Sequence, residues 1–144
     1  MSNVIMETCL FCEIVKGTIP SHTVYEDDAV VAFLDIRPVN PGHLLIIPKA
    51  HVSNYLEAPI ETVAMLARVT RQLAPAVLKA VGANAFNIGV NCGRDAGQVV
   101  FHLHFHLMPR FPDDGHQLWK GREEYAATLP EVAEKIKQSL VALG

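Results

Sequence analysis

Three histidines alternate with bulky apolar residues in the run VVFHLHFHLM, from Val99 to Met108. A short apolar run bounded by Gly97 and Pro109 predicts a β-strand. Side chains on a strand point alternately to its two faces, so alternate residues share a face, about 6.6 Å apart. One face would carry His102, His104 and His106, and the other would carry Leu103, Phe105 and Leu107.

This row of imidazoles indicates chemistry rather than packing. A single histidine on a strand is most often a structural residue. Three histidines at every second position of an apolar strand are harder to explain in that way, because each buried imidazole needs hydrogen-bond partners or costs stability. Such a row could pass a ligand or a proton along its length.

A second group with possible chemistry lies near the start of the chain, where Cys9 and Cys12 form a Cys-x-x-Cys pair. In an intracellular protein this pair indicates a metal site or a redox pair. A closed structural zinc site needs four ligands, and the pair supplies two of them. The third cysteine, Cys92, falls in a predicted loop, and an odd number of cysteines does not suggest a disulfide framework.

Length and composition limit the functions to be considered. The 144 residues fit a single domain, and 50% hydrophobic with 19% charged residues is ordinary for a globular protein. The net charge of −3 argues against duplex nucleic acid as a partner. No apolar run approaches the roughly 20 residues that a membrane helix needs. The first eight residues lack a secretory pattern, so we expect a cytoplasmic protein.

The elements that must position these groups follow from the hydrophobic pattern. Besides the histidine run, the apolar stretches predict four strands, and spacing typical of a helix predicts three helices. The strands are Val24–Tyr25, Val30–Leu34, His43–Ile47 and Phe86–Val90; the helices are Glu13–Ile19, a long one from Pro59 to Ala80, and a final one carrying Val132, Ile136 and Leu140. Pro75 should kink the long helix or begin a second segment, and Thr128 to Glu131 has the form of a capping box.

The run His102 to Met108 matches the His-φ-His-φ-His-φ-φ motif (φ, apolar) of the histidine triad superfamily. The chain resembles the histidine triad nucleotide-binding (Hint) branch, in the bacterial form that carries Cys-x-x-Cys. Further blocks in the same order are CLFCEIV from Cys9, YEDD from Tyr25, FLDIRP from Phe33, PGH from Pro41, IPKAH from Ile47 and the loop from Asn91 to Gln98.

This resemblance implies an α+β domain of about five mainly antiparallel strands with a long helix and a C-terminal helix. The domain would span residues 1–144, with a core of about 9–110 and an extension over 111–144. The resemblance also implies a homodimer that uses the long helix.

The resemblance implies zinc as well. In relatives with the cysteine pair, among them galactose-1-phosphate uridylyltransferases, two histidines complete the site, and the matching positions are His51 and His102. A Cys₂His₂ tetrahedron suits zinc chemically. The alternative is that Cys9 and Cys12 are packing thiols, with the two histidines bonded to each other.

By the same resemblance the ligand is a purine nucleotide. Asp35 would accept hydrogen bonds from the ribose hydroxyls, and Phe33 and Ile36 would hold the base. Asn91 and Gln98 would contact the phosphate, and the backbone from Gly97 to Val99 would help to cradle it. His43 alone could be structural or functional, and we take it as structural, near the site.

The implied reaction is hydrolysis at the α-phosphate of an adenosine 5′-phosphoramidate or a similar conjugate. His104 would attack phosphorus and form a nucleotidyl-imidazole, His106 would contact the phosphoryl oxygens, and His102 would serve structurally. Val99 stands where relatives commonly have Ser or Thr, and valine cannot donate a proton to the leaving group. The alternatives are a diadenosine polyphosphate hydrolase, a nucleotide-binding protein without turnover, and a bare zinc module.

Overall fold

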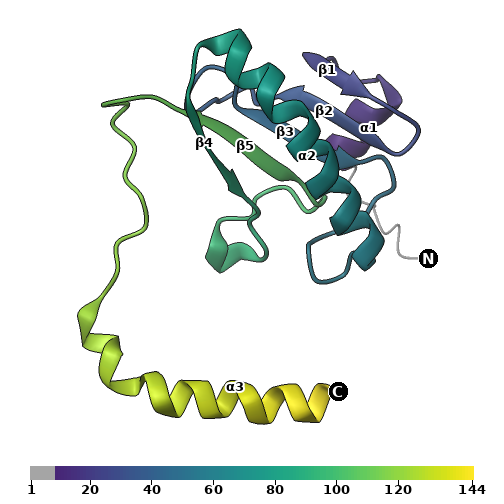
Figure 1. The fold of residues 1–144 in the computed structure, drawn as a ribbon. Coiled ribbons are helices and arrows are strands. Elements are labelled where there is room, and N and C mark those ends of the chain that lie inside the picture. The colour runs from purple at the N-terminus through teal and green to yellow at the C-terminus, as the bar shows by residue number, and fades with distance from the viewer. Residues whose placement is uncertain (1–8) are drawn as a thin grey trace, which may run out of the picture. The chain divides into compact units, whose positions relative to one another are not determined.

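The structure, a computed structural model, describes residues 9–144, which form two compact units. The first unit ends at Asp114, and the second is Gly115–Gly144. The sequence had placed this boundary near residue 110. The first unit contains α1 (Leu10–Lys16), β1 (Thr23–Glu26), β2 (Val30–Leu34), β3 (Leu44–Pro48), α2 (Ile60–Val81), β4 (Ala85–Gly89), the 3₁₀ turn η1 (Arg94–Ala96) and β5 (Phe105–Arg110) (Figure 1). The second contains the 3₁₀ turn η2 (Glu123–Thr128) and α3 (Leu129–Leu143).

The five strands form one antiparallel sheet in the order β1-β2-β3-β5-β4. The β1–β2 hairpin closes on Asp27, whose carboxylate accepts the peptide N–H groups of Ala29 and Val30 at 2.8 Å each. Asp side chains commonly accept such bonds in turns. The predicted five-stranded antiparallel sheet is therefore confirmed.

A different helix packs against each face of the sheet (Figure 1). On one face, α2 packs Leu66, Val69 and Ala74 against a cluster that includes Leu103, Phe105 and Leu107, the predicted apolar side of the histidine run. On the other face, Phe11 of α1 packs against a second cluster of Val31, Phe33, Leu45 and Ile47. Side chains that alternate along the strands thus pack either against α2 on one face or against α1 on the other.

The histidine run differs from its prediction, because β5 begins only at Phe105 and continues through Pro109 to Arg110. Pairing explains both ends. On one side β4 ends at Gly89, opposite His106, so His102 and His104 have no strand beside them there. At the C-terminal end of β5, the pairing with β3 stops at Leu107. Pro109 therefore has no β3 residue opposite it, and its missing N–H breaks no hydrogen bond between these two strands.

Three other elements depart from their predictions. Helix α1 starts at Leu10, three residues early, because Cys9 acts as its N-cap and its Sγ accepts the Cys12 N–H at 3.4 Å. Pro75 was expected to kink the long helix or to begin a second segment, and no second segment forms, because α2 is one helix with Pro75 inside it. The capping box is also wrong: the Thr128 hydroxyl donates to the Tyr125 carbonyl and makes no cap bond to α3.

The second unit carries the predicted amphipathic helix. Val132, Ile136 and Leu140 lie along α3, and each side chain is exposed. Within the described residues, no helix combines the length and apolarity needed to cross a bilayer.

Candidate active site and metal centre

A pocket of about 440 Å³ opens between α1, the end of β2 and the segment that leads into β5. Its lining is mostly apolar, and it brings together residues that are far apart in the sequence. Eight of the nine predicted nucleotide-binding residues line it: Phe33, Asp35, Ile36, Asn91, Gly97, Val99, His104 and His106. A small, mostly apolar pocket with a few convergent polar groups is typical of a ligand site.

The ring of His104 is held by a backbone carbonyl. Its Nδ1 lies 2.7 Å from the carbonyl oxygen of His102, and a carbonyl can only accept, so Nδ1 carries the proton. Phe11 packs edge-on against the ring, with 5.1 Å between centroids. Burial lowers the pKa of His104, which favours the neutral ring. The other nitrogen, Nε2, therefore has a free lone pair, which is the state that a nucleophile requires.

His106 is set by a second histidine. The peptide N–H of Val39 donates to Nδ1 of His43, so the proton of neutral His43 is on Nε2. That Nε2 lies 2.9 Å from Nδ1 of His106 and donates to it. His106 must then carry its own proton on Nε2. Among the residues that the structure describes, this buried Nε2 has no hydrogen-bond partner. It is a donor ready for a ligand oxygen.

The three histidines next to the pocket are therefore neutral and of defined tautomer. Burial lowers the pKa of His43. Burial, with smaller contributions from His104 and His43, lowers the pKa of His106 to about 4. The rings of His104 and His106 lie 4.9 Å apart between centroids. A lone pair on one ring thus stands beside an N–H donor on the next.

Asp35 lies at the end of β2 beside these rings. Its Oδ1 accepts the peptide N–H of Arg37 at 2.8 Å, and its Oδ2 is 3.7 Å from Nε2 of His43. Asp35, His43 and His106 are close enough to suggest a metal site. A metal at Nε2 of His43 would need an imidazolate, because Nδ1 already accepts a peptide N–H. The hydrogen bonds therefore indicate that His43 and His106 are joined by a hydrogen bond rather than by a metal. Asp35 can then accept a hydrogen bond from a ligand.

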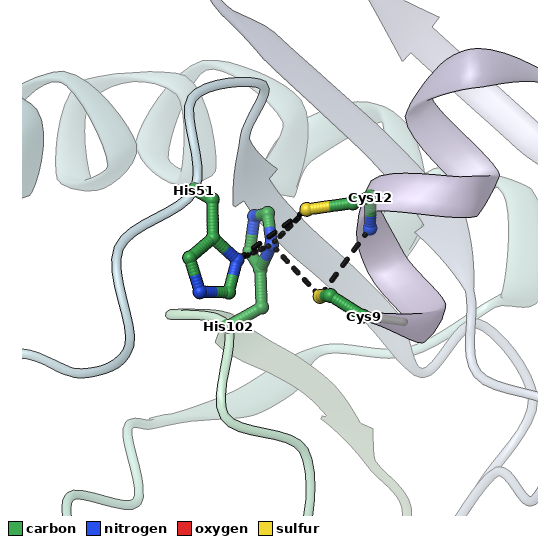
Figure 2. A group of neighbouring side chains, drawn as sticks. All are labelled: Cys9, Cys12, His51 and His102. Atoms are coloured by element: carbon green, nitrogen blue, oxygen red, sulfur yellow. Dashed lines mark hydrogen bonds between the residues drawn. The ribbon is translucent and has the colours of Figure 1, made fainter. Parts of the chain in front are cut away.

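A second group of side chains, whose sulfur and nitrogen atoms could bind a metal, surrounds Nδ1 of His102. Ligand atoms of four residues converge within 4.8 Å of one another: Cys9 at the N-cap of α1, Cys12 within α1, His51 after β3 and His102 before β5 (Figure 2). The Nδ1 of His102 lies 3.4 Å from Sγ of Cys9, 3.6 Å from Sγ of Cys12 and 3.2 Å from Nδ1 of His51. Cys12 Sγ and His51 Nδ1 are 3.3 Å apart.

These distances fit a tetrahedral metal site. Ordinary Zn–N and Zn–S bonds imply ligand separations of about 3.3 Å between two nitrogens and about 3.6 Å between nitrogen and sulfur. The tautomer fits as well. Nε2 of His102 donates to the carbonyl of Pro48 at 2.8 Å, which leaves Nδ1 unprotonated toward the thiols. Such an outer hydrogen bond is what orients metal-binding histidines. The four residues predicted from the sequence could therefore hold a metal together.

Gln98 is the one predicted nucleotide-binding residue that does not line the pocket. Its side chain is buried and braces the loop before β5. Its oxygen accepts from the peptide N–H of Gly93, and its nitrogen donates to the carbonyls of Ser53 and Val100. All of its strong hydrogen-bonding groups are engaged within the protein, so its place is structural, next to Asn91 and Gly97, which do line the pocket.

Two functional residues were not identified from the sequence. Phe11 touches both His102 and His104, and it forms part of the pocket wall. Its position between the two cysteines was the available signal. His43 was taken as structural, and only the fold shows that it bonds to His106. The Pro-Gly-His turn before β3 carried no sign of that long-range contact.

The HIT domain family matches residues 16–113 of the chain, which include the three histidines and most of the residues that line the pocket. The chain belongs to the HIT family. A crystal structure of a protein from Streptococcus mutans, 43% identical, superposes on this HIT protein with a TM-score of 0.87 and covers 97% of this chain and 90% of its own.

Two other relatives carry functional descriptions. A HIT family protein of Arabidopsis thaliana, the adenylylsulfatase HINT3, is 41% identical over 109 residues, which are 76% of this chain and 55% of that protein. A Zn-bound histidine triad protein from Mycobacterium smegmatis is 37% identical, with a TM-score of 0.74, and the match covers 92% of this chain and 97% of that one.

Proposed function

We propose that this HIT protein hydrolyses conjugates of a purine nucleoside monophosphate at the α-phosphate, with Nε2 of His104 as the nucleophile. The observation that carries the proposal is the 2.7 Å bond between Nδ1 of His104 and the His102 carbonyl. It fixes the tautomer with a lone pair on Nε2, in a ring that lines the pocket. The Arabidopsis relative supports a nucleotide conjugate as the substrate, because an adenylylsulfatase acts on an adenylyl group.

The residues of the pocket have distinct parts in this reaction. Phe33 and Ile36 hold the base, and Asp35 accepts hydrogen bonds from the ribose hydroxyls through the oxygen that Arg37 does not occupy. Asn91 and the backbone near Gly97 face the phosphate. The Nε2–H of His106 donates to a phosphoryl oxygen as charge develops on it. Nε2 of His104 forms the bond to phosphorus, and water then releases the monophosphate and restores the ring.

The first test is release of AMP from an adenylyl conjugate by the wild type and by His104→Ala. We expect the wild type to release AMP and the variant to lose at least about 1,000-fold in kcat. His22→Ala is the matched control, because His22 is exposed and does not line the pocket. Equal turnover by the wild type and His104→Ala would refute the proposed nucleophile. Tight AMP binding without turnover by the wild type would instead favour a nucleotide-binding protein.

We also propose that the metal held by Cys9, Cys12, His51 and His102 is zinc. The donor set of two thiolates and two imidazoles is typical of structural zinc, and the Mycobacterium relative is Zn-bound. Bound zinc would supply a fixed tie between α1 and the segment before β5. Metal analysis after purification without chelator should find one equivalent in the wild type and in Cys92→Ser, and a loss in Cys9→Ser. Full metal content in Cys9→Ser would refute the site.

A further inference from the structure

A largely buried ion pair lies outside the pocket, next to the turn that carries His43. The carboxylate of Asp114, whose side chain is 7% exposed, accepts from both Nε and Nη2 of Arg110, at 2.8 and 3.0 Å. Burying a charged pair costs desolvation, which close pairing offsets only when further hydrogen bonds satisfy the remaining groups. Neither residue lines the pocket, so any influence on the reaction must pass through another residue.

The same carboxylate holds the side chain of Asn40. The amide nitrogen of Asn40, Nδ2, donates one hydrogen to Oδ2 of Asp114 at 2.9 Å and the other to the carbonyl oxygen of Pro109 at 3.0 Å. Both partners only accept, so the amide cannot turn over without placing its own oxygen against two oxygens. Asn40 is thereby tied to the C-terminal end of β5 and to the residues that follow it.

Asn40 is also the first residue of the turn that ends at His43. Its carbonyl oxygen accepts the peptide N–H of His43 at 3.2 Å, with Pro41 and Gly42 between them. A proline in second place and a glycine of positive φ in third place, here +87°, are typical of a type II turn. The space beside Gly42 is filled, because a Cβ there would lie 3.0 Å from Cγ1 of Val81 in α2. The turn is thus held at both Asn40 and Gly42.

This turn decides which nitrogen of His43 faces His106. Val39 directly precedes Asn40 in the chain, and its N–H donates to Nδ1 of His43 at 3.1 Å. With that nitrogen occupied, Nε2 of His43 keeps the proton and donates to Nδ1 of His106. An anchor at Asn40, one residue along the chain, therefore keeps the Val39 N–H within reach of the ring.

We propose that Asn40 and Asp114 are positioning residues for the reaction, because they hold the turn that fixes the tautomer of His106. This inference rests on the proposed function, in which Nε2–H of His106 donates to a phosphoryl oxygen. When the turn is released, Nδ1 of His43 can carry the proton and its Nε2 can accept one. His106 then carries its own proton on Nδ1 and presents a lone pair to the phosphate, which repels a phosphoryl oxygen.

The first part of the test measures the ring tautomers and needs no turnover. In protein with isotope-labelled histidine, the NMR shifts of the ring nitrogens distinguish a protonated nitrogen from one with a lone pair. Asn40→Ala removes both Nδ2 bonds, and we expect His43 and His106 to change from one tautomer to a mixture. Asn87→Ala is the matched control, because it removes the 2.8 Å bond from Nη1 of Arg110 and leaves Asn40 in place. Its tautomers should match those of the wild type.

The second part asks whether the tautomer matters for the reaction. In Asn40→Ala we expect kcat for release of AMP to fall about 2- to 10-fold, the bias that one lost hydrogen bond removes, while KM stays close to that of the wild type. In a His43→Ala background, Asn40→Ala should lower kcat no further, because both changes act through the same ring. A second variant, Asp114→Asn, leaves one oxygen to accept where the carboxylate has two, and should change the tautomers and kcat in the same direction.

The outcomes separate this inference from the proposed function. Unchanged tautomers in Asn40→Ala would overturn the inference and leave the proposed function standing. So would the same change of tautomers in Asn87→Ala, or a further loss of kcat when Asn40→Ala is added to His43→Ala, since either would show an effect of packing alone. If the wild type released no AMP from an adenylyl conjugate, the proposed function would fail, whereas the tautomers would still decide whether Asn40 positions His43.

Discussion

Nε2 of His43 lies 2.9 Å from Nδ1 of His106, and this contact decides which nitrogen of His106 faces the pocket. The direction of the bond follows from the backbone, because the Val39 N–H occupies the other nitrogen of His43. A residue outside the triad motif therefore sets the tautomer of a residue within it. His43 is a positioning residue for His106.

Replacement of His43 should lower kcat more than it raises KM. In His43→Ala the Nδ1 of His106 loses its donor, so the ring can carry its proton on either nitrogen and the donor toward phosphate is lost part of the time. We expect kcat to fall about 10-fold or more. His43→Gln keeps an N–H that can donate to His106 and should recover part of kcat. A variant that changes only KM, or equal losses in both variants, would show that His43 acts through packing alone.

The buried histidines should make stability depend on pH. The pKa of His106 is about 4 in the folded protein and near 6.5 when the chain is unfolded, so between these values the unfolded chain binds more protons. The free energy of unfolding should therefore fall as the pH falls from 7 toward 4, by on the order of 2 kcal/mol at pH 5 for this group. His43 has a lowered pKa as well and contributes with the same sign.

Urea denaturation at pH 7 and pH 5 measures this effect. His106→Gln should show a smaller difference between the two pH values than the wild type, whereas His22→Gln, at an exposed position, should match the wild type. An unchanged pH difference in His106→Gln would contradict a strongly lowered pKa.

Phe11 should matter for both stability and ligand binding. Its ring is 5% exposed and contacts Phe33 and His104, with centroids 5.4 and 5.1 Å away. Phe11→Ala should lower the free energy of unfolding by about 3–5 kcal/mol and weaken AMP binding, because the cavity opens the pocket wall. Phe86→Ala is the control, since Phe86 is 37% exposed on the edge strand β4. Calorimetric titration with AMP that gave the same affinity for both variants would contradict a role for Phe11 in the pocket.

Local hydrophobic patterns predicted the individual strands and helices, whereas the antiparallel sheet and most of the site residues were predicted from the resemblance to the Hint branch. The alternating run from Leu103 to Leu107 correctly assigned one face to the core. Cys9 and Cys12 lie with His51 and His102 in a group that could hold a metal, and their role as ligands stays a prediction. Two features that the sequence did not predict depend on contacts between distant residues. The start of β5 is set by where β4 ends, and the role of His43 is set by a bond across 63 positions. Homodimerisation and a cytoplasmic location stay predictions.

Gln98 was predicted to bind the nucleotide, but the structure shows its side chain bonded within the protein. The resemblance implied a phosphate contact for Gln98, yet its amide is engaged by Gly93, Ser53 and Val100. Gln98→Glu replaces the donor with an oxygen that faces two carbonyls, so we expect a loss of about 1–3 kcal/mol in the free energy of unfolding. Gln72→Glu, on the exposed side of α2, should have little effect. Unchanged stability in Gln98→Glu, together with a selective loss of phosphate affinity, would restore the original prediction.

The proposed reaction requires that Nε2 of His104 form a covalent bond to phosphorus. The most direct measurement is mass spectrometry of peptides from enzyme mixed with an adenylyl substrate and quenched within the first turnover. We expect an adenylyl group on the peptide that contains the triad, with fragmentation placing it on His104, and no such group in His104→Ala. Turnover of the same substrate with no adenylyl label at any time, or a label on His106, would show that His104 is not the nucleophile.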